Sequence, residues 1–229
     1  NRLLELTKPV ATAVVPISAG RHIYKREPSF PIAVACDPAF NFVYEANIRY
    51  LHHLGEVTYF SPLADTSLPD AGFVYLPGGY PELYLAALSA NRQMLQSIRR
   101  YVESGGKLLA ECGGMMYLCD EIRDKNGYVY PMAGVLHQSA TMENMKLRLG
   151  YRTLLYNETR LKGHEFHYSR LVEQQNPLPS CAVAYTAKGV ETDTPLYHYK
   201  NVWAGYTHLY WADPVGNEWF TKFVIDGNT

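Results

Sequence analysis

Residues 107–118 read Lys-Leu-Leu-Ala-Glu-Cys-Gly-Gly-Met-Met-Tyr-Leu, an apolar run followed at once by a cysteine, two glycines and a helical pattern. The pattern predicts a strand over 107–110, a sharp turn at Cys112 and a helix that begins at Gly113. Small neighbours permit such a turn, and the helix start supplies backbone N–H groups that favour a thiolate. We therefore predict that Cys112 is a nucleophile. The alternative is a buried, small apolar residue.

Short apolar runs and helical patterns alternate on the N-terminal side of this segment. Strands are predicted over 32–36, 57–60 and 72–76, and helices over 43–54 and 81–103, with a break at 89–91. This alternation predicts a parallel sheet with helices on both faces, whose functional groups collect at the carboxyl ends of the strands. Three such ends are chemically suggestive, namely Cys36-Asp37, Pro77-Gly78-Gly79 and Glu111-Cys112-Gly113.

The C-terminal half has a different pattern, rich in Thr, Tyr and Val between turn residues. Strands are predicted over 146–157, 162–171, 181–187, 196–199 and 202–211, mostly antiparallel, with a last helix over 214–225. The predicted fold class is therefore α/β. It is an open, mostly parallel sheet flanked by helices, with added antiparallel strands in the C-terminal half. Residues 31–229 are predicted to form one domain, and residues 1–30 a linker.

Composition excludes several classes of protein. The chain has 229 residues, of which 47% are apolar, and a net charge of −1, which does not suit a nucleic-acid partner. Its apolar stretches are too short for a membrane span, and four scattered cysteines do not suggest a disulfide framework. We therefore expect a cytoplasmic protein. The sequence starts at Asn1, and residues 1–7 have the pattern of the end of a helix, so we also expect it to be part of a longer polypeptide. It contains no phosphate-binding loop.

A thiol nucleophile needs groups that stabilise an oxyanion and move a proton. Gly79 and Gly113 follow two predicted strands, and their N–H groups are expected to form an oxyanion hole. His208 closes a strand-like run and is a candidate base, in competition with His164 and His167. The last two are not expected to bind metal, because residues i and i+3 of a strand face opposite ways.

Several blocks of the sequence are together similar to one known family. They are residues 37–47 (Asp-Pro-Ala-Phe-Asn-Phe-Val-Tyr-Glu-Ala-Asn), 60–63 (Phe-Ser-Pro-Leu), 75–83 (Tyr-Leu-Pro-Gly-Gly-Tyr-Pro-Glu-Leu), 110–118, 163–169 and 205–209. From about Ile32 to Trp211 the chain resembles the C-terminal glutaminase domain of cobyrinic acid a,c-diamide synthases. These belong to the class I (triad-type) glutamine amidotransferases, which have a flavodoxin-like fold.

This resemblance implies a reaction and a partner. Cys112 would attack the side-chain amide of glutamine, Gly79 and Gly113 would hold the oxyanion, and His208, rather than the other histidines, would move the proton. The ammonia would pass to an N-terminal synthetase domain, where ATP and Mg²⁺ serve to activate the a- and c-acetate carboxylates of cobyrinic acid. No cofactor or metal is expected in the glutaminase domain itself, and residues 1–30 would be the junction between the two domains.

The chain departs from the wider superfamily at one point. Triad-type enzymes usually carry His-x-Glu, whereas residues 208–210 are His-Leu-Tyr, as in the corrinoid branch. Glu165, Asp213 or a backbone carbonyl are candidates to orient His208, and a Cys–His dyad is the working description. The alternative functions are the glutaminase of cobyric acid synthase or of nickel-sirohydrochlorin a,c-diamide synthase, a hydrolase or chaperone of the DJ-1 type, and a non-catalytic docking domain.

Overall fold

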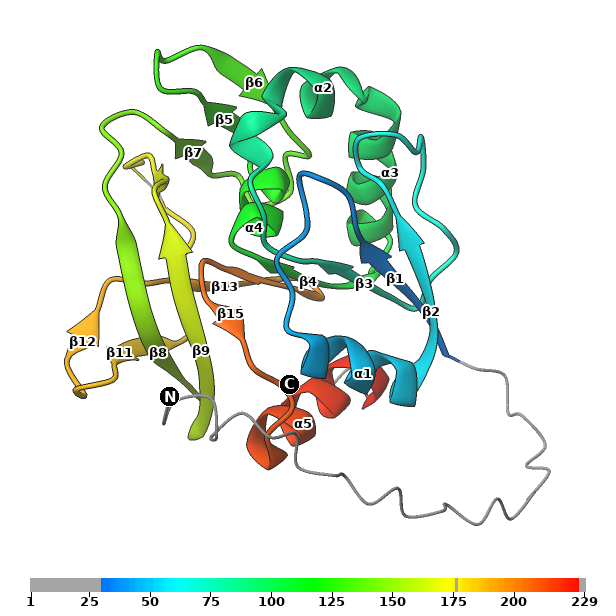
Figure 1. The fold of residues 1–229 in the computed structure, drawn as a ribbon, viewed down its shortest axis with the longest axis vertical. Coiled ribbons are helices and arrows are strands. Elements are labelled where there is room, and N and C mark those ends of the chain that lie inside the picture. The colour runs from blue at the N-terminus through cyan, green and yellow to red at the C-terminus, as the bar shows by residue number, and fades with distance from the viewer. Residues whose placement is uncertain (1–29, 176, 227–229) are drawn as a thin grey trace, which may run out of the picture.

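A six-stranded sheet forms the centre of the computed structural model, which describes residues 30–175 and 177–226 (Figure 1). Its strands are β1 (Phe30–Ala35), β2 (Gly55–Phe60), β3 (Phe73–Leu76), β4 (Lys107–Glu111), β13 (Leu196–Tyr199) and β14 (Val202–Gly205). Their order is β13-β14-β4-β3-β1-β2, and every neighbouring pair is parallel except β13 with β14. From β2 to β14 the parallel strands follow the flavodoxin-like order 2-1-3-4-5, as predicted.

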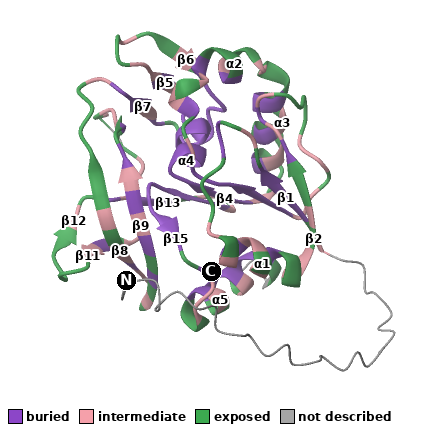
Figure 2. Cartoon of the chain, viewed as in Figure 1, coloured by how far each residue is buried: buried purple, intermediate pink, exposed green. Residues whose placement is uncertain are grey.

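Helices cover both faces of this sheet. They are α1 (Glu45–Leu54), α2 (Leu85–Ala90), α3 (Arg92–Glu103), α4 (Gly113–Leu118) and α5 (Pro214–Thr221), with a 3₁₀ turn over Pro81–Leu83 and a π-helical turn over Lys222–Asp226. One core cluster lies under α2, α3 and α4, and a second lies under α1 and α5. Figure 2 shows that α4 and the strands beside it are buried. Asn91 caps α3, which explains the break predicted at 89–91.

Two smaller sheets contain the remaining strands. One has the order β10-β7-β5-β6, and the other β12-β11-β8-β9-β15. Their bounds are β5 Glu121–Arg123, β6 Val129–Pro131, β7 Ser139–Thr141, β8 Arg148–Tyr156, β9 Thr159–His167, β10 Arg170–Leu171, β11 Val183–Thr186, β12 Glu191–Thr192 and β15 His208–Leu209. Every pairing in the five-stranded sheet is antiparallel, as predicted for this half.

The sequence-based predictions miss two features of the fold. β14 pairs in parallel with β4 and extends the main sheet, although its residues read like the antiparallel strands around them. β5, β6 and β7 were not predicted, because each has only three residues and no alternation long enough to detect. The predicted linker, residues 1–30, lies outside the described residues except for Phe30, the first residue of β1. None of the helices in the described part of the chain is long and apolar enough to cross a membrane.

Candidate active site

The backbone at Cys112 makes the sharp turn that the sequence predicts. Cys112 joins β4 to α4 with φ 48° and ψ −105°, a strained conformation for a residue that carries a side chain. Its N–H donates to the Gly205 carbonyl oxygen at 2.7 Å, which ties the turn to the end of β14. A Cβ on Gly114 would lie 2.1 Å from the Leu76 oxygen, so only glycine lets α4 approach β3 this closely. Strain of this kind is typical of functional sites.

The two glycines predicted to hold an oxyanion lie side by side. Gly79 has φ +153°, and a Cβ there would lie 2.2 Å from the Ala39 oxygen. A Cβ on Gly113 would lie 3.2 Å from the Gly79 nitrogen, so the two backbones converge from β3 and β4. The Gly113 N–H also binds the Cys112 sulfur and lowers the pKa of its thiol. The two glycine backbones thus converge, and one of them donates to the sulfur.

His208 reaches the same edge of the sheet from β14. It opens β15, three residues after the last residue of β14, and is 3% exposed. Its ring packs on the Phe42 ring, with centroids 4.3 Å apart, and against Gly78, where a Cβ would lie 2.1 Å from His208 Cε1. Since β3, β4 and β14 are neighbours in the sheet, the three candidate components of the site meet at one edge.

The two competing histidines lie on β9. His164 is the register partner of His208, and the two ring centroids are 6.0 Å apart. His167 stacks on the Tyr206 ring at 3.8 Å, and its Nδ1 is 2.9 Å from the Ser169 oxygen. His164 is half-buried, whereas His208 is buried and lies against Gly78. No group of three or more His, Cys, Asp and Glu side chains among the described residues could hold a metal ion.

The expectation of a thiolate at Cys112 is wrong for this structure. Burial raises the pKa of the Cys112 thiol to about 12, and the carboxyl groups of Glu82, Glu111 and Glu165 add to the increase. The Gly113 N–H, which lowers this pKa, does not offset the loss of water. Burial also lowers the pKa of His208 to about 3. A neutral thiol therefore lies in a site with a neutral imidazole, so the sulfur needs a base to become a nucleophile.

Neither carboxylate proposed to orient His208 does so. Glu165 pairs with Arg152 at 2.7 Å, and Asp213 caps α5 by accepting from the Gly216 N–H at 2.7 Å. Among the described residues, Glu111 carries the one carboxylate that lies within 4.0 Å of a His208 nitrogen.

Two residues that hold the His208 segment were missed. Glu111 Oε1 accepts from the Leu209 N–H at 3.0 Å. Asn47 of α1 donates to the Leu209 oxygen at 2.7 Å and accepts from the Trp211 N–H at 2.9 Å. Both side chains are buried. The available signal was a polar residue in an otherwise apolar pattern, at the end of a strand for Glu111 and on the buried face of a helix for Asn47.

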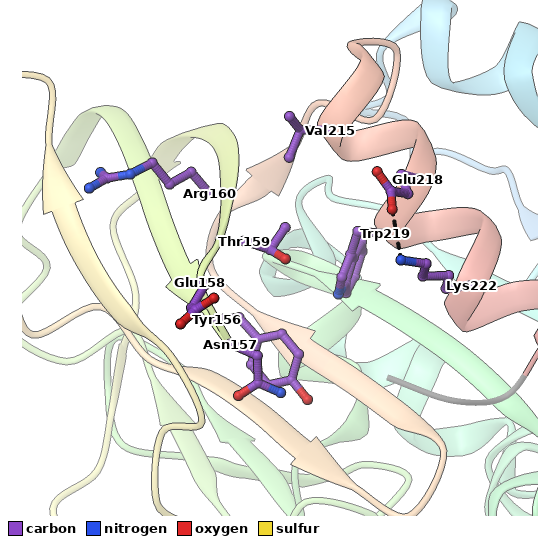
Figure 3. Close-up of a pocket in the computed structure, with 9 residues that line it drawn as sticks. All are labelled: Tyr156, Asn157, Glu158, Thr159, Arg160, Val215, Glu218, Trp219 and Lys222. Atoms are coloured by element: carbon purple, nitrogen blue, oxygen red, sulfur yellow. Dashed lines mark hydrogen bonds and ion pairs between the residues drawn. The ribbon is translucent and has the colours of Figure 1, made fainter.

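Two hollows lie near the small antiparallel sheets. A cavity of about 460 Å³ lies between the β8–β9 turn and α5, and Figure 3 shows that its lining includes Trp219 and the Glu218–Lys222 ion pair. It shares no residue with the candidate site. The other, of about 580 Å³, is lined by Arg148, Glu165, His167 and Tyr206 among others. Cys112 does not line this cavity, but the carbonyl oxygen of Phe166, which lies between the lining residues Glu165 and His167, is 3.9 Å from Cys112 Sγ.

Comparison with known proteins decides the family. The model of the CobB/CobQ-like glutamine amidotransferase domain matches residues 31–215, which include every component of the site. The chain belongs to this family. The resemblance noted from the sequence is thereby confirmed. The fold class is confirmed by a solved glutamine amidotransferase, which superposes with a TM-score of 0.55 at 17% identity. The superposition covers 84% of this chain and 98% of that structure.

Curated relatives of this amidotransferase domain carry synthase names. It is 40% identical over 185 residues to hydrogenobyrinate a,c-diamide synthase of Pseudomonas aeruginosa and 40% identical over 188 residues to cobyrinate a,c-diamide synthase of Fusobacterium nucleatum. Each alignment covers 78% of this chain. The chain spans only 41% of the length of each of these two relatives, so they contain a second region of comparable size.

Proposed function

We propose that this chain is the glutaminase part of a cobyrinic acid a,c-diamide synthase, with Cys112 as its nucleophile. The observation that carries the proposal is the meeting of a strained Cys112 turn, two convergent glycine backbones and a buried His208 at one sheet edge. Glutamine amidotransfer needs these three components, namely a sulfur, oxyanion donors and a group that moves protons.

The proposed reaction follows from these positions. His208 takes the thiol proton as Cys112 Sγ bonds to the side-chain amide carbon of glutamine, and the Gly79 and Gly113 N–H groups hold the oxyanion. The C–N bond breaks, His208 returns the proton to the leaving nitrogen, and ammonia and a γ-glutamyl thioester result. Water then attacks the thioester, again with its proton passing to His208. Glutamate leaves, and the thiol is restored.

The 580 Å³ cavity beside the sulfur is our candidate for the glutamine pocket. The α-carbon of glutamine carries an ammonium and a carboxylate group, so its pocket needs groups of both charges. Arg148 and Glu165 both line the cavity, and Glu165 is fully buried and paired with Arg152. We expect Glu165 to attract the α-amino group and Arg148 the α-carboxylate.

The proposed partner is a synthetase region of the same polypeptide. It would bind cobyrinic acid and use ATP with Mg²⁺ to activate the a- and c-acetate carboxylates. The proposed location is the cytoplasm, because all four cysteines are free. Its docking surface would be a row of rings over His208, in which neighbouring centroids are 5.7 to 6.2 Å apart. We call this row the aromatic face; it consists of Tyr210, Tyr44, Phe42, His164 and Tyr151.

The aromatic face is exposed, which supports a docking role. Tyr151 is 72% exposed and Phe42 36%, although apolar groups of this size are usually covered when they form a continuous patch. Tyr151→Glu in the natural polypeptide is expected to lower glutamine-dependent amidation and leave glutamine hydrolysis in place. The matched control is Tyr128→Glu, since Tyr128 is 67% exposed but lies outside the face. Equal effects of the two variants would argue against this docking surface.

The central experiment is labelling of the natural polypeptide with 6-diazo-5-oxo-L-norleucine, a diazoketone that mimics glutamine. Intact mass and peptide mapping are expected to show a single adduct, on Cys112, that excess glutamine suppresses. An adduct on another residue would show that Cys112 is not the nucleophile. No adduct, with Cys112 still open to a generic alkylating agent, would indicate a non-catalytic docking domain and overturn the proposal.

A further inference from the structure

The Glu111 carboxylate is held in place on both of its oxygens. It follows the apolar run of β4, is 2% exposed, and directly precedes the nucleophile. Oε2 accepts from the Tyr75 hydroxyl at 2.7 Å, and Oε1 accepts from the Leu209 N–H at 3.0 Å. Among the ion pairs of the described residues, Glu111 has one partner that can become a cation, and it is His208. A buried carboxylate with so few partners needs a reason to be there.

One nitrogen of His208 has no hydrogen-bond partner and faces this carboxylate. Nδ1 of His208 is buried and 4.0 Å from Glu111 Oε2. The ring has little freedom to turn away, because Phe42 packs on it and Gly78 lies against its Cε1 edge. With Nδ1 directed at Glu111, the opposite nitrogen, Nε2, is the one left for the sulfur and the substrate.

We infer that Glu111 is the positioning residue of His208, replacing the glutamate that other triad-type enzymes carry two residues after the histidine. The inference rests on the proposed function, in which His208 moves the proton. When the 4.0 Å separation closes, Glu111 accepts a hydrogen bond from Nδ1–H, so that Nε2 is the free base, and the carboxylate stabilises the imidazolium that forms when the thiol proton arrives. It also holds the Leu209 backbone, and therefore fixes both the ring and the strand that carries it.

The charge state of Glu111 makes this role measurable. Burial raises the pKa of Glu111 to about 8 and lowers that of His208 to about 3. The other titratable groups that face this pair or influence it are Tyr44, Tyr75, Cys112, His164 and His167. Burial raises the pKa values of Tyr44 and the Cys112 thiol to about 12, raises that of Tyr75 well above its ordinary value, and lowers those of both histidines. Between pH 7 and 9, Glu111 is thus the group of this set that changes charge.

The ionised carboxylate can only accept hydrogen bonds and therefore favours the Nδ1–H tautomer of His208, whereas the protonated acid can donate to Nδ1, which sets the direction of the pH dependence. Glutamine hydrolysis by the natural polypeptide is expected to rise as Glu111 loses its proton, with an inflection near pH 8. Glu111→Gln is expected to abolish this inflection and to lower kcat by about 10²- to 10⁴-fold, with KM for glutamine changed by less than about threefold. Glu111→Asp, which keeps the charge, is expected to restore the inflection and part of kcat.

A merely structural role would give a different pattern. Tyr75→Phe removes a donor to Oε2 and serves as the matched structural control. Because that donor lowers the pKa of Glu111, the inflection is expected to persist in Tyr75→Phe and to move to higher pH. Circular dichroism of each variant checks that it is folded. If Glu111→Asp is folded but behaves like Glu111→Gln, or if Glu111→Gln keeps the inflection, Glu111 does not position His208.

The result for His208 separates this inference from the proposed function. If His208→Asn retains wild-type turnover, the assignment of the base fails, and the inference fails with it. If His208→Asn loses turnover while Glu111→Gln keeps both kcat and the pH profile of the wild type, the proposed function stands and only the inference on Glu111 is overturned. A ¹⁵N spectrum of His208 gives a second readout, since the Nδ1–H tautomer is expected above pH 8 in the wild type and not in Glu111→Gln.

Discussion

Gly78→Ala tests the position of His208 without removing any functional group. A Cβ at this position would lie 2.1 Å from His208 Cε1 and 2.9 Å from its Nδ1. Ordinary contacts between carbon atoms are about 3.5–4.0 Å, so the ring must move by roughly 1.5 Å. A displacement of about 1 Å in a reacting group can cost on the order of 100-fold in rate. We therefore expect kcat for glutamine hydrolysis to fall about 100-fold, with a cost in stability of about 1–3 kcal/mol from the added methyl group.

The assay is glutamate release by the natural polypeptide, with thermal unfolding measured in parallel. Gly72→Ala is the matched control, because its Cβ would lie 2.6 Å from the Phe30 ring, at the opposite end of β3 from Gly78. It is expected to lose a similar amount of stability and to keep its activity. If Gly78→Ala is folded and hydrolyses glutamine within about threefold of the wild type, His208 does not act from the place that the structure gives it.

Four further predictions concern the same edge of the sheet. Cys112→Ser is expected to abolish glutamine-dependent amidation by the natural polypeptide and to spare ammonia-dependent amidation; loss of both would contradict the division of labour. His208→Asn is expected to slow thioester formation by about two to four orders of magnitude in a rapid-quench experiment, and His167→Asn is not. Since the folded pKa of Glu111, about 8, exceeds its ordinary value of 4.5, its contribution to stability is full below pH 4.5 and declines as pH rises to 8. Between pH 7 and 8, where His208 is mostly neutral in both states, the decline is about 1 kcal/mol at 1.36 kcal/mol per pKa unit. Urea unfolding is expected to show that this decline is absent in Glu111→Gln. Asn47→Ala removes both bonds to the strand after His208 and is expected to cost about 1–3 kcal/mol in the same unfolding experiment, whereas no change would mean that the strand is held by other contacts.

Local patterns were sufficient for most of the main sheet. β4 and α4 lie where residues 107–118 predicted them, because an apolar run that ends at a cysteine and two glycines leaves few other local structures. The helix break at Asn91 was also predicted, since its side chain caps α3. The parallel direction of β14 could not be predicted, because it depends on which strand β14 pairs with and is not indicated by the side chains of β14 itself.

The site was predictable in its parts and not in its electrostatics. Cys112, Gly79 and Gly113 follow strands, and the ends of neighbouring parallel strands meet, so their approach could be expected. The direction of the thiol pKa shift could not. It follows from how completely the sulfur is removed from water, which the packing of β9 and α4 around it decides.

The sequence by itself determined the fold class, the family and the nucleophilic turn, because each can be recognised from short local patterns and their order along the chain. Tertiary structure alone decided how His208 lies against the glycine loop and which carboxylate faces it. His208 and Glu111 are 97 positions apart, and they meet only because β14 inserts beside β4 and the chain then turns back into β15. The sequence around either residue does not indicate this contact, because strand pairing and burial bring the two residues together.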